Sequence, residues 1–106
     1  MSTDYNSLKT KVAKLLKVTT RPMFGYQCYS ISGKFFVGFS NKNAHVVIVR
    51  LPKQLSESAI KKKGIKPFSH GAKMGWIEMD VRNVSLASSF KLISNGYNYA
   101  KELSKK

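Results

Sequence analysis

The feature that most constrains the fold is a series of three apolar segments in the middle of the chain, joined by turns of two or three residues. Tyr, Phe, Val and Ile are frequent in these segments, and such residues favour strands over helix. The predicted strands are 27–31, 34–40 and 44–51, separated by Ser32–Gly33 and by Asn41–Asn43. Strands joined by turns this short are antiparallel neighbours in one sheet. The sequence therefore predicts an antiparallel meander.

Apolar residues occur on both faces of the third predicted strand. Val47 and Val49 lie on one face and Val46 and Ile48 on the other, because successive side chains of a strand point in opposite directions. A sheet face that meets water is usually polar. We therefore expect both faces of this sheet to be covered in places.

An amphipathic helix is predicted before the meander, within residues 1–17. Five apolar residues fall on one stripe when the chain turns by about 100° per residue, namely Tyr5, Leu8, Val12, Leu15 and Leu16. Asp4 suits its N-terminal end, and Arg21–Pro22 ends the segment. The opposite side of this helix is basic.

A second helix is predicted after the meander. Pro52 suits its first turn, and we expect it to reach about Lys63 and to stop at Gly64. Leu55 and Ile60 form its expected apolar side.

A loop and a fourth strand follow. The stretch 64–75 is rich in glycine and has only isolated apolar residues, so we expect a loop. Alternation returns in 76–81, with Ile77, Met79 and Val81 on one side, and predicts a strand.

The last segment, from Ser85 to about Leu103, predicts a third helix with two apolar stripes. The first stripe is Leu86, Phe90, Ile93 and Tyr97, and the second is Leu92, Tyr99 and Leu103. One glycine inside a helix costs only about 1 kcal/mol relative to alanine. We therefore expect the helix to continue through Gly96.

The expected architecture is one α+β domain over residues 1–106, with the order α-β-β-β-α-β-α. It has an antiparallel four-stranded sheet with flanking helices. A chain of 106 residues is the length of one small domain, and 42% hydrophobic residues suffice for a core.

The charge balance favours acidic partners. Nineteen Lys and Arg residues against five Asp and Glu give a net charge of +14, so nucleic acid is the first candidate. The lone cysteine, Cys28, excludes an intrachain disulfide and suits a reducing compartment such as the cytoplasm. No apolar run approaches the roughly 20 residues that span a bilayer, and we expect no membrane segment or signal peptide.

The cations form two clusters that are candidate phosphate-binding sites. The first is Lys9, Lys11, Lys14, Lys17 and Arg21, and the second is Lys61, Lys62, Lys63, Lys66 and Lys73, close to Phe68, His70 and Trp76. Lysine suits sequence-independent phosphate contacts, whereas base reading more often uses arginine. The alternative is that these lysines solvate helix faces and reflect the coding bias of the source.

Residues for catalysis or metal binding are few. Glu78 and Asp80 share a strand face, but no second acid or histidine is near in sequence. Cys28, His45 and His70 lack the short spacing of metal ligands. No glycine-rich phosphate loop precedes a helix. We therefore expect no enzyme activity, no metal and no cofactor.

Several short elements resemble the amino-terminal domain of the TfoX/Sxy proteins and the related YjbR/MmcQ group. These elements are Arg-Pro-Met-Phe-Gly at 21–25, Tyr29 with Gly-Lys-Phe-Phe-Val at 33–37, 44–50, Gly-Ile-Lys-Pro-Phe at 64–68, 73–79, and Tyr-x-Tyr-Ala-x-x-Leu at 97–103. They fall in the order that those families have and cover about residues 5–103.

The resemblance implies a small α+β domain with an antiparallel sheet flanked by helices and no catalytic residues. It also implies a regulatory or DNA-binding role. The chain departs from the family pattern at Tyr26, where the family usually has a second glycine, and it stops where full TfoX proteins carry a second, helical domain.

Two functions therefore remain open. The first is a cytoplasmic nucleic-acid-binding protein, with DNA favoured over RNA, that contacts phosphates through the two lysine clusters. The second is a protein-interaction or adaptor module in which Leu92, Tyr99 and Leu103 dock a partner or a second copy. A membrane-surface role is disfavoured because the apolar stripe of the first helix lacks Trp and Phe.

Overall fold

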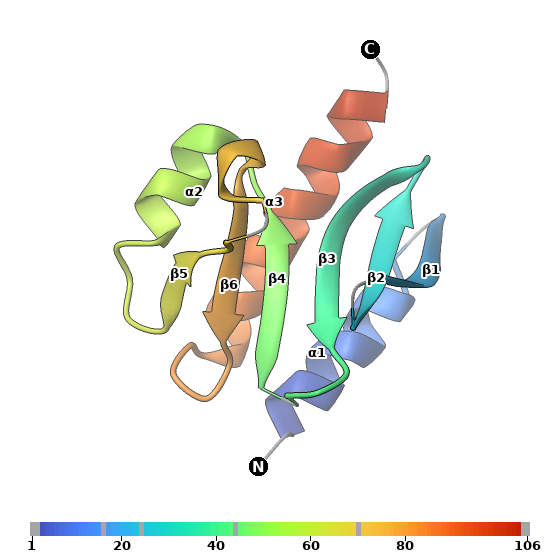
Figure 1. Ribbon diagram of the computed structural model, residues 1–106. Helices are drawn as coiled ribbons and strands as arrows, with labels where there is room; N and C mark the ends of the chain where they lie inside the picture. Colours follow the sequence, from blue (N-terminus) through green and yellow to red (C-terminus); the bar gives the residue numbers. More distant parts are fainter. Residues whose placement is uncertain (1–2, 16, 24, 44, 70, 105–106) are drawn as a thin grey trace.

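The computed structural model describes residues 3–15, 17–23, 25–43, 45–69 and 71–104. Its elements in chain order are α1 (Thr3–Ala13), β1 (Val18–Met23), β2 (Tyr26–Ile31), β3 (Lys34–Ser40), β4 (Val46–Arg50), α2 (Lys53–Ala59), β5 (Ile65–Pro67), the short 3-10 helix η1 (Ala72–Met74), β6 (Trp76–Asp80) and α3 (Leu86–Ser104). The strands form one sheet in the order β1-β2-β3-β4-β6-β5, with antiparallel neighbours throughout (Figure 1). The α+β class and the antiparallel meander are confirmed.

Over the described residues the sheet has six strands, so the prediction of four was wrong. The chain leaves α1 at Ala13, turns at Lys17 with φ of 62°, and enters β1 along the edge of β2. Four consecutive residues of β1 are exposed, so no apolar alternation marked it. Strand β5 has only three residues and ends on Pro67, which is tolerated at a sheet edge.

One face of the sheet carries the hydrophobic core. Phe39, Val47, Met79 and Ile65 are aligned across four strands by their register, and all four are buried. Cross-strand partners share a face, so this row marks the side on which the helices pack.

The helices cover this face. In Figure 1, α1 and α3 lie behind the sheet. Helix α1 contributes Tyr5, Leu8 and Val12 to the core, as predicted, and the buried Ala59 of α2 belongs to the same core. Leu15 is partly buried, and Leu16 lies outside the described residues. Helix α3 runs unbroken through Gly96, which confirms its predicted continuity.

Helix α2 differs from its prediction. It is shorter than expected and ends at Ala59, and Leu55 is 41% exposed rather than on the packed side. The buried residues of α2 are Ser56 and Ala59, while Ile60 just beyond it is partly buried. Small side chains therefore hold α2 against the sheet.

We call the opposite side of the sheet the open face. Its central positions are Cys28, Gly38, Ile48, Glu78 and Lys66, which the register aligns across five strands. The connection from β5 to β6 reaches over this face, and the ring of its Phe68 contacts Tyr26 of β2. Part of the open face is therefore covered, as expected, and the segment that covers it is a loop. None of the described helices has the length and hydropathy to cross a bilayer.

A candidate ligand pocket on the open face

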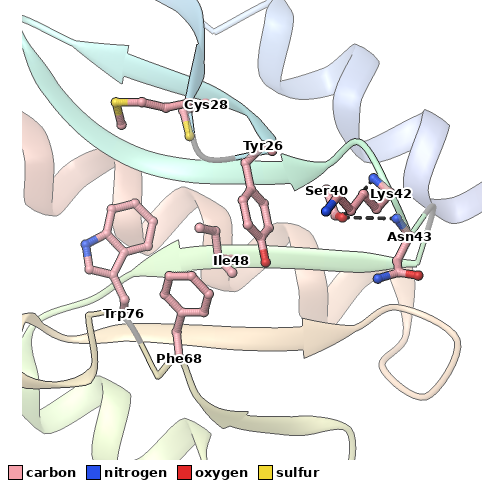
Figure 2. Close-up of a pocket in the computed structure, with 10 residues that line it drawn as sticks. Tyr26, Cys28, Ser40, Lys42, Asn43, Ile48, Phe68 and Trp76 are labelled. Carbon is pink, nitrogen blue, oxygen red and sulfur yellow. Dashed lines mark hydrogen bonds between the residues drawn. The ribbon is translucent and has the colours of Figure 1, made fainter.

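The open face contains a pocket of about 560 Å³. A volume in this range is typical of small-ligand sites. Most of its lining is apolar or aromatic, and the lining residues are Met23, Gly25, Tyr26, Cys28, Ser40, Lys42, Asn43, Ile48, Phe68 and Trp76. In Figure 2 the rings of Tyr26, Phe68 and Trp76 surround Ile48, and Lys42 and Asn43 lie together at one end.

The floor of the pocket is formed by three strands. Cys28, Gly38 and Ile48 are cross-strand partners in β2, β3 and β4. A Cβ at Gly38 would lie 2.9 Å from Ile48 Cγ1 and 3.2 Å from Cys28 Sγ. A side chain at this position would have to displace both neighbours, so the glycine leaves room for Ile48 and Cys28 at the pocket floor.

The aromatic wall comes from the two halves of the strand order, with Tyr26 on β2 and with Phe68 and Trp76 at the ends of β5 and β6. The rings of Tyr26 and Phe68 meet edge to face, with centroids 5.8 Å apart and an interplanar angle of 80°. Tyr26, Phe68 and Trp76 are all half-buried, so each ring is partly accessible. Burial first, and then the nearby Glu78, raise the pKa of Tyr26. Its phenol is therefore neutral at physiological pH and can donate a hydrogen bond.

Between the end of β5 and the first residue of β6, backbone hydrogen bonds join Phe68, Gly71 and Trp76. The amide of Phe68 donates to Trp76 O at 3.1 Å, and the amides of Gly71 and Trp76 donate to Phe68 O and Gly71 O, each also at 3.1 Å. Gly71 lies against the indole, because a Cβ there would be 2.7 Å from Trp76 Cδ1. These bonds fix the backbone positions from which the Phe68 and Trp76 side chains extend.

The polar rim is the turn between β3 and β4. Ser40 Oγ accepts hydrogen bonds from the amides of Lys42 at 3.2 Å and Asn43 at 3.0 Å (Figure 2). From the helix side, the Tyr5 hydroxyl donates to Ser40 O at 2.6 Å. The turn is thus fixed from both sides, and Lys42 and Asn43 are left exposed.

The groups in and near the pocket suit binding more than covalent chemistry. Burial raises the pKa of the Cys28 thiol, which keeps it protonated and weakly nucleophilic. Glu78 lies 3.5 Å from Lys66 Nζ, and Asp80 lies 2.8 Å from Arg82 Nη2. Within the described ranges, no group of three or more His, Cys, Asp or Glu side chains could hold a metal ion, and His70 lies outside those ranges.

The structure does not bring the two predicted lysine clusters together. The first lies on α1 and at β1, the second between α2 and β6, and β1 and β5 are opposite edges of the sheet. Edge strands of a six-stranded sheet are about 24 Å apart at about 4.8 Å per strand. Lys9 and Lys11 lie over the rings of Tyr5 and Phe90 in the helical layer. Lys14, Lys17 and Lys61–Lys63 are exposed.

Two of the predicted cations, Arg21 and Lys66, lie on the open face, and a third, Lys73, lies close to it in sequence. Arg21 is the cross-strand partner of Cys28, and Lys66 is the partner of Glu78, so both share the face of the pocket floor. Lys73 is exposed in η1, three residues before Trp76. Lys42 of the pocket rim, which sequence reasoning did not single out, adds a fourth cation.

The second apolar stripe of α3 is partly occupied by contacts within the chain. Leu92 packs against the core, and the Arg50 guanidinium lies 5.7 Å from the centroid of the Tyr99 ring. Leu103 is half-buried. A partner docked on this stripe stays a prediction.

No family model matches the chain, and no curated protein matches it. Among solved structures, the chain is similar to a structural-genomics protein from Pseudomonas syringae. The TM-score is 0.71 at 16% sequence identity, over 90% of this chain and 97% of that one. At this identity the likeness concerns the fold alone.

Sequence reasoning missed the pocket because its walls come from distant segments. Phe68 and Trp76 were noted only as neighbours of a lysine cluster, and nothing near Tyr26 in the sequence indicates that it meets Phe68. The one available signal was the pair of apolar faces on β4, of which Ile48 is now seen to form the pocket floor.

Proposed function

We propose that this protein is a non-enzymatic, cytoplasmic nucleic-acid-binding protein, with DNA as the first candidate, and that the open face is its binding surface. The observation that carries the proposal is the placement of Arg21 and Lys66 on the open face and of Lys42 at the pocket rim, with the exposed Lys73 three residues before Trp76, in a chain of net charge +14. Such a field attracts polyphosphates, and exposed cations around one face are suited to contact successive phosphates.

Two further observations support the proposal. Asp80, a carboxylate near this face, is paired with Arg82, which is not one of these four cations, so it repels an approaching phosphate less than a free acid would. The free, buried thiol of Cys28 suits a reducing compartment. The resemblance of 21–25 and 33–37 to the TfoX and YjbR groups favours the same class of partner, although Phe24 lies outside the described residues.

A salt titration with matched variants tests the proposal. If about four cations each meet a phosphate, the logarithm of affinity should fall against the logarithm of salt concentration with a slope of about −3 to −4. The triple variant R21A/K42A/K73A should weaken binding and flatten this slope. The control is K14A/K91A/K101A, which removes the same charge from exposed positions in the helical layer.

Comparing the two triple variants distinguishes a localised binding surface from a general electrostatic attraction. Equal losses in the two triple variants would mean that net charge alone attracts the nucleic acid, and the open face would lose its assigned role. No binding of the wild type to DNA or RNA at low salt would overturn the proposal altogether.

A further inference from the structure

We propose that the pocket on the open face receives an unpaired base, so that the preferred ligand is a single-stranded nucleic acid. This inference rests on the proposed function and specifies its ligand. Three partly accessible aromatic rings line one hollow, and bases of any sequence stack on such rings because each base has a π-face. The bases of a duplex are stacked on one another and cannot enter the pocket.

The polar groups of the pocket suit the edge of a base. The exposed Asn43 side chain carries both a hydrogen-bond donor and acceptors, which is the combination that pairs with base edges. The Ser40 hydroxyl oxygen already accepts two amide hydrogen bonds, which leaves its proton to donate. The neutral Tyr26 phenol, on the cross-strand partner of Ser40, adds a further donor.

The charges suit the phosphates on either side of such a base. Arg21 lies on the β1 side of the pocket floor, and Lys66 lies on the β5 side. Lys42 is at the rim. An apolar, aromatic hollow between exposed cations is the arrangement that single-strand-binding proteins use, in which backbone contacts alternate with base stacking.

The single tryptophan makes the inference directly measurable. Trp76 lines the pocket and is the one Trp in the sequence, so all indole fluorescence comes from the site. Titration with a thymidine oligonucleotide should change this fluorescence. An abasic oligonucleotide of the same length, which keeps the phosphates, should bind about 5- to 150-fold more weakly and leave the fluorescence unchanged, since this range corresponds to the loss of one stacked base.

Variants locate the effect. Phe68→Ala removes one wall, and Asn43→Ala removes an exposed rim amide with little risk to folding. Both should weaken binding of the thymidine oligonucleotide and leave binding of the abasic one unchanged. Leu55→Ala truncates an exposed apolar residue of α2 and is the matched control.

The outcomes distinguish this inference from the proposed function. If duplex, abasic and thymidine oligonucleotides bind equally, with no change in Trp76 fluorescence, the base pocket is overturned while phosphate binding survives. If none of them binds, the proposed function fails first. If benzoate, as a small aromatic anion, changes the fluorescence and no oligonucleotide does, the pocket takes small ligands and the inference is wrong.

Discussion

At the scale of single residues, Gly75 is the glycine that leaves the least room for a side chain. Its φ is +91°, and a Cβ would lie 2.0 Å from Leu51 O. We expect Gly75→Ala to lower the free energy of unfolding by about 3 kcal/mol or more, because strain and a backbone clash add together. Urea unfolding followed by circular dichroism measures the change.

Gly25 is the control for Gly75. It also has a positive φ, of +82°, but no atom lies within 4 Å of a Cβ built there. Gly25→Ala should therefore cost only the conformational penalty, about 1 kcal/mol. Equal losses in the two variants would mean that the contact between Gly75 and Leu51 has no energetic weight.

Asp80 couples stability to acid pH. Hydrogen bonds from the Arg82 side chain, opposed by some burial, lower its pKa from 3.8 to about 2. A carboxylate with a depressed pKa in the folded state contributes stability above about pH 4, and this contribution is lost as the pH falls toward 2. The wild type should therefore lose stability over this interval, and Asp80→Asn should lose less.

Chemical unfolding at pH 6, 4 and 2.5 measures this difference. Glu57→Gln, which removes an exposed carboxylate from α2, serves as the comparison. An identical pH dependence of wild type and Asp80→Asn would show that the bonds between Asp80 and Arg82 are not maintained in solution.

At the scale of elements, the link between α1 and the β3–β4 turn joins the core to the pocket rim. Tyr5 packs edge to face on Phe39, and its hydroxyl donates to Ser40 O in a buried hydrogen bond. Tyr5→Phe keeps the ring and removes the donor, so we expect a loss of about 1 to 2 kcal/mol. Faster amide exchange at Asn43, whose N–H bonds to Ser40 Oγ, should accompany it.

The exchange measurement shows whether the turn depends on α1. Tyr5→Phe could destabilise the protein without speeding amide exchange at Asn43 beyond the change expected from global unfolding. In that case the Ser40 side chain alone holds the rim.

Elements with strong periodicity could be predicted from the sequence, and those without it could not. Strand β6 and the first apolar stripe of helix α3 bury residues that the pattern assigned to one side, such as Met79 and Ile93. Strand β1 forms because its backbone pairs with the edge of β2. This pairing depends on the folded sheet and leaves no pattern in the residues of β1. The pocket was missed for the same reason, since Tyr26 and Phe68 meet only after the sheet forms.

At the scale of the whole molecule, the net charge of +14 acts on the stability of every element at once. Mutual repulsion of the cations destabilises the compact state, and salt screens it, with a Debye length of about 10 Å at 0.1 M. We expect the free energy of unfolding to rise by about 1 kcal/mol between 10 and 150 mM sodium chloride, or ~4–8 °C in Tm. Differential scanning calorimetry measures it, and a lower Tm at 150 mM would contradict the prediction.

Helices α1, α2 and α3 contribute to the core on one face of the sheet. Alternate residues of a strand therefore have different surroundings. Along β4, Val47 and Val49 belong to the core, while Ile48 between them lies in the pocket. If the pocket binds a ligand as proposed, substitutions at one parity should change binding, and substitutions at the other should change stability. The scaffold can consequently be given new binding residues on alternate strand positions while the positions that hold it together stay as they are.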